Sequence, residues 1–311
     1  MLPNTFVAGA QKSGTTTICT LLSLHPECIL SNPKEPTFFC RKDNLDKLGI
    51  YESYFRQSEK ITTTRCIIDG STAYMVDPEV PARIRDTLGD DLYFIFSLRK
   101  PVDRTISAYW QMVKKGYEQR PVNDVLTFES DTLDEAILEE EEKLKYAVRL
   151  GLVNIAVYEK RYDDPLWNYR YLRNSHYRKD LARYFMLFPR DRIKVVLFED
   201  LVTDAPKMMH QIAHFLRLDP ELMKSDGQMH YNPSRLPRWE MLSRRIIPIF
   251  RSVPGKSFLH RIPGISLSYN LLFSYKMPVA DKKIVDKISG MFNRELVDLS
   301  EMIRRDLQIW T

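Results

Sequence analysis

The chain has 311 residues, a length that fits one large α/β domain or at most two domains and excludes a scaffold of many domains. Hydrophobic residues make up 44% of it and charged residues 28%, with 11 glycines and 18 prolines, which is typical of a globular chain and excludes collagen-like and low-complexity classes. The formal net charge of +5 is small for this size and does not by itself indicate nucleic-acid binding.

The cysteines and the N-terminus bear on the cellular compartment. All four cysteines lie in the first quarter of the chain and form no C-x-x-C pair, which favours a reducing compartment. The N-terminus lacks a basic region followed by a long apolar region, and no stretch reaches the roughly 18 apolar residues of a membrane span. We therefore expect a cytoplasmic protein without an integral membrane segment.

Strand-like and helix-like patterns alternate along the chain. Short apolar runs that predict buried strands lie at residues 5–10, 66–69, 92–98 and 194–198. Apolar residues at helical spacing predict helices at residues 15–24, 101–116 and 205–216. The acidic pattern over residues 134–146 predicts a solvated amphipathic helix without chemistry. This alternation predicts an α/β fold with a central, mainly parallel sheet flanked by helices.

The loop between the first strand and the first helix has the features of a phosphate site. Gly9 and Gly14 have the five-residue spacing of a loop whose backbone N–H groups and helix N-terminus face a phosphate. An ATP- or GTP-binding loop has lysine directly after the second glycine, whereas this chain has Thr15 there and Lys12 inside the loop. Such a lysine lies beside a terminal 5′-phosphate, which predicts a donor with a shorter 5′ chain. The expected fold is thus a P-loop-like three-layer sandwich; a solvated glycine-rich turn is the alternative interpretation of the loop.

Three motifs in order resemble sulfotransferases that use 3′-phosphoadenosine 5′-phosphosulfate (PAPS). Residues 11–16 (QKSGTT) resemble the family's 5′-phosphosulfate loop, and residues 34–39 (KEPTFF) resemble the K-E-x-x-F-F stretch that follows it. Residues 97–109 are similar to the family's strand, R-x-P and R-x-x-S-x-Y helix. The resemblance covers nearly the whole chain and is to bacterial-type members related to heparan-sulfate-type sulfotransferase domains.

The resemblance implies a set of donor-binding residues. In the first motif these are Gln11, Lys12, Ser13, Gly14, Thr15 and Thr16. Arg99 and Ser107 are implied to hold the 3′-phosphate, and an arginine ending a buried strand can converge with a serine of the next helix on one anion. The alternative is that Arg99 caps the following helix and Ser107 only packs.

One segment carries the basic excess of the chain. Between residues 233 and 261 seven Lys and Arg residues face one acidic residue, Glu240, so the local charge is 7 minus 1, or +6. Residues 231–278 have no clear period and predict an irregular basic insertion in a single domain over residues 1–311. We expect one of its cations, Lys256, to add to the donor site; a surface or membrane-surface role fits equally well.

Glu35 is the expected general base. Transfer of a sulfuryl group to a hydroxyl requires a carboxylate to take the acceptor's proton and a cation to neutralise charge on the departing phosphate. Glu35 and Lys12 would divide these roles, and the family's equivalent glutamate is implied to be catalytic. Lys34 and Tyr177 are expected on the acceptor side. The alternative for Glu35 is a surface ion pair.

Two positions depart from the family pattern and bear on the acceptor. Gly70 stands where polysaccharide-modifying relatives have lysine, and Thr72 stands where proline is usual, which puts a polysaccharide acceptor in doubt. We expect sulfuryl transfer from PAPS to a hydroxyl or amine of a small molecule such as a natural product, with release of 3′,5′-bisphosphoadenosine. The alternatives are a carbohydrate or polysaccharide O-sulfotransferase, an ATP-dependent small-molecule kinase, against which Thr15 argues, and a non-catalytic nucleotide-binding module.

No metal site is expected. His210 and His214 have zinc-like spacing, but Gln211 stands where the zinc motif has glutamate. His25 near Cys28 lacks two further ligands. We expect no metal and no nucleic-acid partner.

Overall fold

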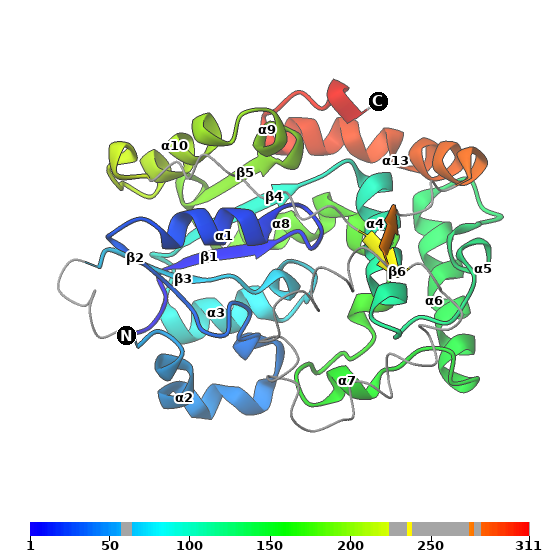
Figure 1. The fold of residues 1–311 in the computed structure, drawn as a ribbon, viewed down its shortest axis with the longest axis horizontal. Coiled ribbons are helices and arrows are strands. Elements are labelled where there is room, and N and C mark those ends of the chain that lie inside the picture. Colours follow the sequence, from blue (N-terminus) through cyan, green and yellow to red (C-terminus); the bar gives the residue numbers. More distant parts are fainter. Residues whose placement is uncertain (57–63, 224–234, 238–273, 277–280, 311) are drawn as a thin grey trace.

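A five-stranded parallel sheet forms the centre of the molecule (Figure 1). The computed structural model describes residues 1–56, 64–223, 235–237, 274–276 and 281–310. The strand order is β2-β3-β1-β4-β5, and every pairing in this sheet is parallel. The strands are β1 (Thr5–Gly9), β2 (Cys28–Leu30), β3 (Cys66–Asp69), β4 (Tyr93–Leu98) and β5 (Ile193–Leu197). The α/β fold with a parallel sheet is confirmed.

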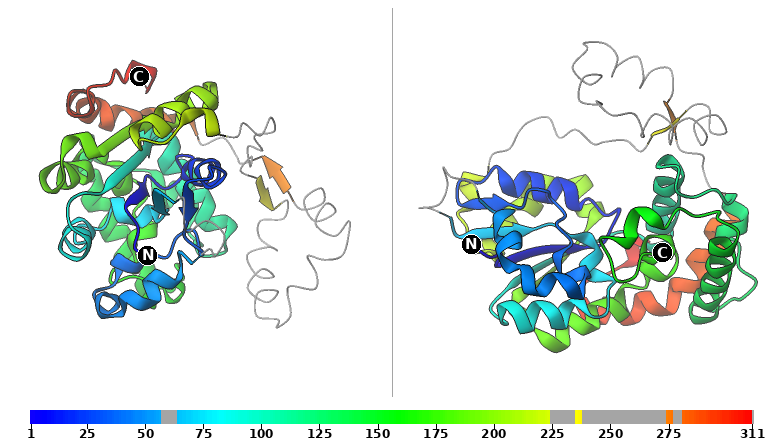
Figure 2. Two further views of the ribbon diagram at one scale, coloured as in Figure 1. Left: turned by 90° about the vertical axis from the view of Figure 1, so that its left-hand side faces the viewer. Right: turned by 90° about the horizontal axis from the view of Figure 1, so that it is seen from below.

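Helices cover both faces of the sheet (Figure 2). Successive strand residues point to opposite faces, so Phe6 and Phe94 enter one core while Val7 and Ile95 enter the other. The core of Val7 contains side chains of α1 (Thr15–Ser23), α9 (Phe198–Thr203) and α10 (Ala205–Phe215). The core of Phe6 contains side chains of α3 (Val80–Leu88), α4 (Pro101–Lys114), α8 (Tyr177–Leu187) and α13 (Lys282–Ile303). The expected three-layer sandwich is confirmed.

Further helices and 3-10 turns connect these elements. In the described part of the chain the other α-helices are α2 (Leu48–Ser53), α5 (Val122–Leu126), α6 (Leu133–Arg149) and α7 (Ala156–Glu159). The 3-10 turns are η1 (Phe38–Cys40), η2 (Lys42–Lys47), η3 (Thr72–Met75), η4 (Trp167–Tyr169), η5 (Arg173–Ser175), η6 (Arg190–Arg192), η7 (Pro220–Leu222) and η9 (Gln308–Trp310).

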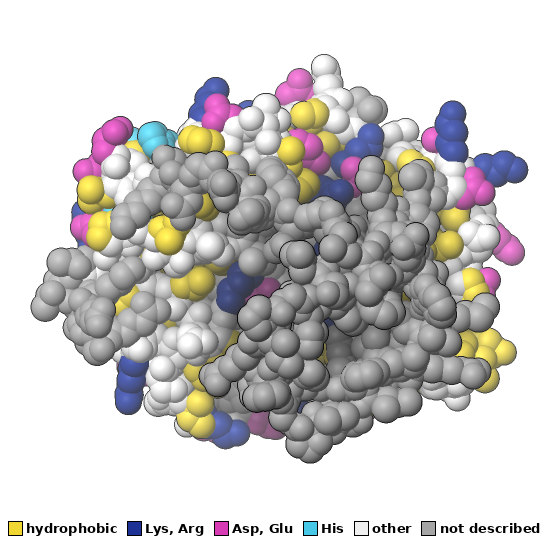
Figure 3. Space-filling model, in the orientation of Figure 1, with side chains coloured by type: hydrophobic (Ala, Val, Ile, Leu, Met, Phe, Trp, Pro, Cys, Tyr) yellow, Lys and Arg dark blue, Asp and Glu magenta, His cyan; other side chains and the backbone are white. Residues whose placement is uncertain are grey.

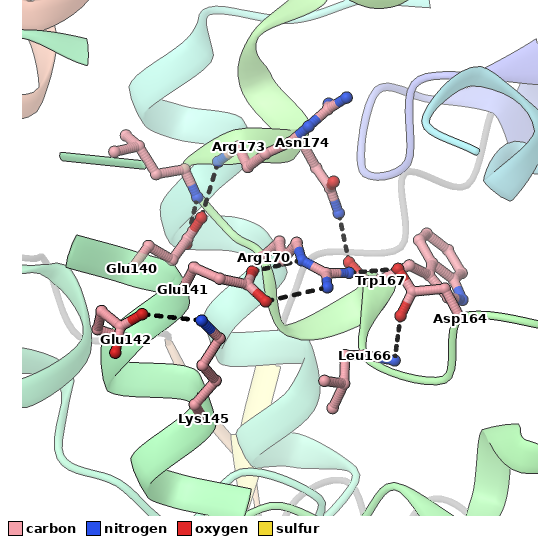
Figure 4. Close-up of polar contacts among 11 residues, drawn as sticks. Glu140, Glu141, Glu142, Lys145, Asp164, Leu166, Trp167, Arg170, Arg173 and Asn174 are labelled. Atoms are coloured by element: carbon pink, nitrogen blue, oxygen red, sulfur yellow. Dashed lines mark hydrogen bonds and ion pairs between the residues drawn. The ribbon is translucent and has the colours of Figure 1, made fainter. Parts of the chain in front are cut away.

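The acidic helix α6 is not wholly solvated, which corrects the expectation for this segment. Glu140 is 3% exposed and accepts the backbone N–H groups of Leu172 and Arg173 at 2.7 and 2.9 Å (Figure 4). Glu141 accepts from Arg170 Nε at 2.7 Å. Burial raises the pKa of Glu140 to about 7. The acidic run therefore fastens the segment around η4 and η5 to α6, a contact that the local charge pattern does not reveal.

The C-terminal residues share a core with the first half of the chain. Helix α13 packs against α4 and α8, and the rings of Trp310 and Tyr177 lie 6.3 Å apart. Arg305 pairs with Asp200 at 3.0 Å. The single domain over residues 1–311 stays a prediction.

The basic insertion is described only at its two ends. Residues Arg235–Pro237 (β6) and Ser274–Lys276 (β7) form an antiparallel pair, and β6 lies against α4 (Figure 1). Lys256 lies outside the described residues, so its expected part in the donor site stays a prediction.

The described surface is mixed in charge on the face shown in Figure 3, where basic and acidic side chains lie next to one another around the rim. The four cysteines all belong to the described part of the chain; each is buried, and none forms a disulfide. None of the helices that the structure describes combines enough length and apolarity to cross a membrane.

Candidate active site

The loop after β1 is tied to β4 and opens directly into α1. Ala10 N–H donates to the Ser97 carbonyl at 2.8 Å, and Ser97 Oγ donates to the Ser13 carbonyl at 2.6 Å. Gly14 has φ of 79°, and a Cβ there would lie 2.8 Å from Leu201 and 2.9 Å from Phe198. Glycine is therefore required at residue 14, because both the backbone conformation and the space exclude a side chain.

The polar groups of this loop fit a phosphate-like ligand. Ser13 is fully buried, and its Oγ has no hydrogen-bond partner among the described residues. Buried hydroxyls normally have partners, so an oxygen-rich ligand at this helix N-terminus would satisfy the group. Thr15 is buried in the first turn of α1, whereas Thr16 is exposed.

Lys12 extends from the loop toward α4 in a strongly basic environment. It has φ of 73°, and its Nζ donates to Gln111 Oε1 at 2.5 Å. Burial, followed by the charges of Arg99, Lys115 and Lys114, lowers the pKa of Lys12 to about 8. The surroundings of Lys12 therefore carry an excess of positive charge, which an anionic ligand would neutralise.

We expect the protein to take up protons when it binds the bisphosphate above pH 8. In the free protein Lys12 loses its charge as the pH rises past about 8, whereas a bound anion favours the charged ammonium. The affinity for the bisphosphate should therefore fall between pH 8 and the ordinary lysine pKa of 10.5. Calorimetry at pH 7 and 9, in buffers of different ionisation enthalpy, measures this uptake. Equal proton uptake by Lys12→Met and the unaltered protein would contradict the assignment.

Arg104 holds the loop from α4, and the sequence-based site did not include it. Its side chain is 1% exposed, and it donates to the Gln11 carbonyl at 3.2 Å and to Gln11 Oε1 at 3.3 Å. It also donates to the Tyr171 carbonyl at 2.8 Å and to Ser175 Oγ at 3.3 Å. Gln11 in turn donates to Asn168 Oδ1 at 2.6 Å. Arg104 lies one turn before Ser107 in the R-x-x-S motif, and this position could have indicated Arg104 as a site residue from the sequence.

Arg99 follows β4 and lies next to the Lys12 loop. Its Nη1 donates to the Lys12 carbonyl at 3.4 Å, and its Cζ lies 5.0 Å from the centroid of the Phe198 ring. Ser107 lies in the second turn of α4 and is 3% exposed. The structure thus places Arg99 beside the phosphate loop; joint binding of one anion by Arg99 and Ser107 stays a prediction.

Tyr177 does not have the position expected for a residue that contacts an acceptor. Its side chain is fully buried, and its hydroxyl donates to the Arg99 carbonyl at 2.9 Å. A side chain with no exposed surface cannot line an open acceptor site. Tyr177 instead supports the backbone that carries Arg99, because α8 packs beneath the end of β4.

Glu35 lies in a small polar cluster after β2, next to the end of β3. Lys34 Nζ lies 3.1 Å from Glu35 Oε1 and donates to the Gly70 carbonyl at 3.2 Å. Thr72 Oγ1 donates to Glu35 Oε2 at 3.2 Å. The Glu35 side chain keeps 36% of its surface exposed, so the carboxylate is held at both oxygens and still open on one side.

The carboxyl ends of three adjacent strands bring these groups together. Strands β3, β1 and β4 are neighbours, and they are followed by Thr72, by Lys12 and by Arg99. Ligands of parallel α/β sheets bind at this edge. The fold and the loop therefore place the protein in the P-loop-like α/β class.

The comparisons with known proteins identify the family. A family model of the sulfotransferase domain matches residues 2–231, and the chain belongs to the sulfotransferase family. The resemblance of the three motifs to this family is thereby confirmed.

Curated relatives and a solved structure agree with this assignment. Heparan sulfate glucosamine 3-O-sulfotransferase 5 of Homo sapiens is 26% identical over 234 residues, which cover 75% of this chain and 58% of that protein. Heparan sulfate glucosamine 3-O-sulfotransferase 3B1 of Homo sapiens is 28% identical over 235 residues, which cover 75% of this chain and 50% of that protein. The chain therefore spans little more than half the length of these relatives. A sulfotransferase from Alicyclobacillus acidocaldarius has the same fold, with a TM-score of 0.61 at 21% identity over 100% of this chain and 99% of that chain.

Proposed function

We propose that this chain transfers a sulfuryl group from PAPS to a hydroxyl or amine of a small-molecule acceptor and releases 3′,5′-bisphosphoadenosine. The observation that carries the proposal is that the Lys12 loop, Arg99 and the Thr72 partner of Glu35 all follow the carboxyl ends of neighbouring parallel strands. Family membership supports the reaction type. The basic surroundings of Lys12 and the unpartnered Ser13 Oγ support an anionic donor at the loop.

The residues have separate roles in this proposal. The donor, when bound, supplies a sulfuryl group on its 5′-phosphate. Glu35 takes the proton of the attacking acceptor as the new bond to sulfur forms. Lys12 and the N-terminus of α1 stabilise the negative charge that stays on the departing phosphate when the old sulfur–oxygen bond breaks. Arg99, with Ser107, holds the 3′-phosphate, and Lys34 lies beside Glu35 on the acceptor side.

A carbohydrate acceptor is the second candidate, because the human relatives described above are named for heparan sulfate. A local feature favours the small molecule. A Cβ at residue 70 would lie 2.8 Å from Cys19 Sγ and 3.2 Å from Lys34 Cε, so the lysine of polysaccharide-modifying relatives has no room there without rearrangement. Radiolabelled PAPS with a panel of small phenols, alcohols and amines, run beside heparan fragments, distinguishes the two; transfer only to the fragments would support the second candidate.

We expect 3′,5′-bisphosphoadenosine to stabilise the protein selectively. A ligand that binds only the folded state raises the free energy of unfolding by about 2.7 kcal/mol at a hundred times its dissociation constant. Thermal unfolding with the bisphosphate, with AMP and with ATP plus magnesium measures the selectivity and requires no acceptor. A rise with ATP and magnesium alone would contradict the proposal and favour the kinase.

Three further expectations belong to this proposal. No metal is required by the roles assigned above; among the residues that the structure describes, no group of three or more His, Cys, Asp and Glu side chains could hold one. A cytoplasmic location and the absence of a nucleic-acid partner stay predictions, which cell fractionation and a nucleic-acid binding assay test.

A further inference from the structure

We propose that Thr72 is a positioning residue for Glu35, holding the carboxylate through its hydroxyl in both protonation states of the base. The inference rests on the proposed function, because it assigns a partner to the proposed base. Its basis is the contact of Thr72 Oγ1 with Glu35 Oε2 at 3.2 Å.

Thr72 is fixed by a rigid turn. It is 3% exposed and begins the 3-10 turn η3, directly after β3. The carboxylate of Asp69 closes this turn by accepting from Ser71 N at 2.9 Å, from Tyr51 Oη at 2.6 Å and from Tyr74 Oη at 2.9 Å. The Thr72 hydroxyl is therefore held by a turn that is fixed to the end of β3.

The segment that carries Glu35 is fastened to the same turn. Thr37 N–H donates to Ser71 Oγ at 2.9 Å, and Ser31 Oγ donates to the Lys34 carbonyl at 2.7 Å. Gly70 N–H donates to the Lys34 carbonyl at 3.2 Å. Residues on both sides of Glu35 are thus held to the end of β3, so the distance between Glu35 and Thr72 is set by backbone contacts.

Thr72 and Lys34 contact different oxygens of the Glu35 carboxylate and differ in the hydrogen bonds that they can form. Lys34 Nζ lies 3.1 Å from Oε1 and can only donate, so it supports the charged carboxylate. A hydroxyl can donate to the carboxylate and, once Glu35 has taken a proton, can accept from the new carboxylic O–H. Thr72 therefore keeps Glu35 oriented before and after proton transfer, while 36% of the Glu35 side chain stays exposed.

The test compares Thr72→Val, which removes the hydroxyl at equal volume, with Thr72→Ser, which keeps it. We expect Thr72→Val to lower kcat about tenfold, the effect of one hydrogen bond to a charged group, with the donor KM unchanged. Thr72→Ser should restore most of kcat. Thr203→Val, which removes an exposed threonine hydroxyl that donates to the Glu199 carbonyl, is the matched control and should behave as the unaltered protein.

A readout without turnover separates this inference from the proposed function. Carbon-13 NMR of the glutamate carboxyls, with the Glu35 signal assigned by its loss in Glu35→Gln, reports the hydrogen bonding of this carboxyl through its chemical shift. We expect the Glu35 carboxyl shift at neutral pH to change in Thr72→Val and in Thr72→Ala, and to return in Thr72→Ser. Chemical shifts that agree in all variants would overturn the inference, even if sulfuryl transfer is found. A changed chemical shift in a protein that transfers no sulfuryl group would support the contact and overturn the proposed function.

Discussion

Replacing Glu35 with glutamine should lower sulfuryl transfer by about 10²–10⁴-fold, the contribution of a general base. Glutamine keeps the size of the side chain; its amide oxygen can still accept from Lys34 and its NH2 can donate to the Thr72 hydroxyl, but the amide takes no proton. The affinity for 3′,5′-bisphosphoadenosine should stay the same, because the donor loop is built after β1 and the glutamate follows β2. Single-turnover transfer rates, together with calorimetric affinities for the bisphosphate, measure the two effects.

Glu142→Gln is the matched control for this change. Glu142 is exposed on α6 and pairs with Lys145 at 2.8 Å, so the same chemical change there should leave the rate and the affinity unaltered. An unchanged rate in Glu35→Gln would remove the glutamate from the catalytic role. A loss of bisphosphate affinity equal to the loss of rate would instead place Glu35 in donor binding.

Replacing Arg104 with alanine should lower the free energy of unfolding by about 3–5 kcal/mol. The buried guanidinium donates to the carbonyls of Gln11 and Tyr171 and to the Ser175 hydroxyl, and each hydrogen bond to a charged group contributes about 1.5–3 kcal/mol. The bisphosphate affinity should fall as well, because Gln11 directly precedes Lys12. Urea unfolding monitored by tryptophan fluorescence, with bisphosphate titrations below the transition, measures both effects.

Arg85→Ala is the control for loss of an arginine. Arg85 is half-exposed on α3 and pairs with its neighbour Asp86 at 3.0 Å, so its removal should change stability by less than about 1 kcal/mol. Arg104→Lys keeps the charge but cannot span the same acceptors and should fall between the two. Equal stability of Arg104→Ala and Arg85→Ala would show that Arg104 does not fasten the loop.

The sequence determined four of the five strands of the sheet, all but β2, and the donor loop, because their signals are local. Strand β4 is a run of apolar residues that alternates between two cores, so composition alone predicts burial on both faces. Gly14 and Lys12 stand within one short loop between a strand and a helix, so their spacing predicts a phosphate site before any contact is known. The family follows from three such local motifs in their order along the chain.

The tertiary structure decided which groups hold the proposed catalytic residues, because those contacts join distant parts of the chain. Lys12 bonds to Gln111, 99 residues away. Tyr177, which was expected to contact the acceptor, is buried and bonds to the Arg99 carbonyl, 78 residues away. Thr72 reaches Glu35 across 37 residues. Periodicity and motif spacing report what each segment does by itself, whereas hydrogen-bond partners depend on how the carboxyl ends of the strands meet at one edge of the sheet.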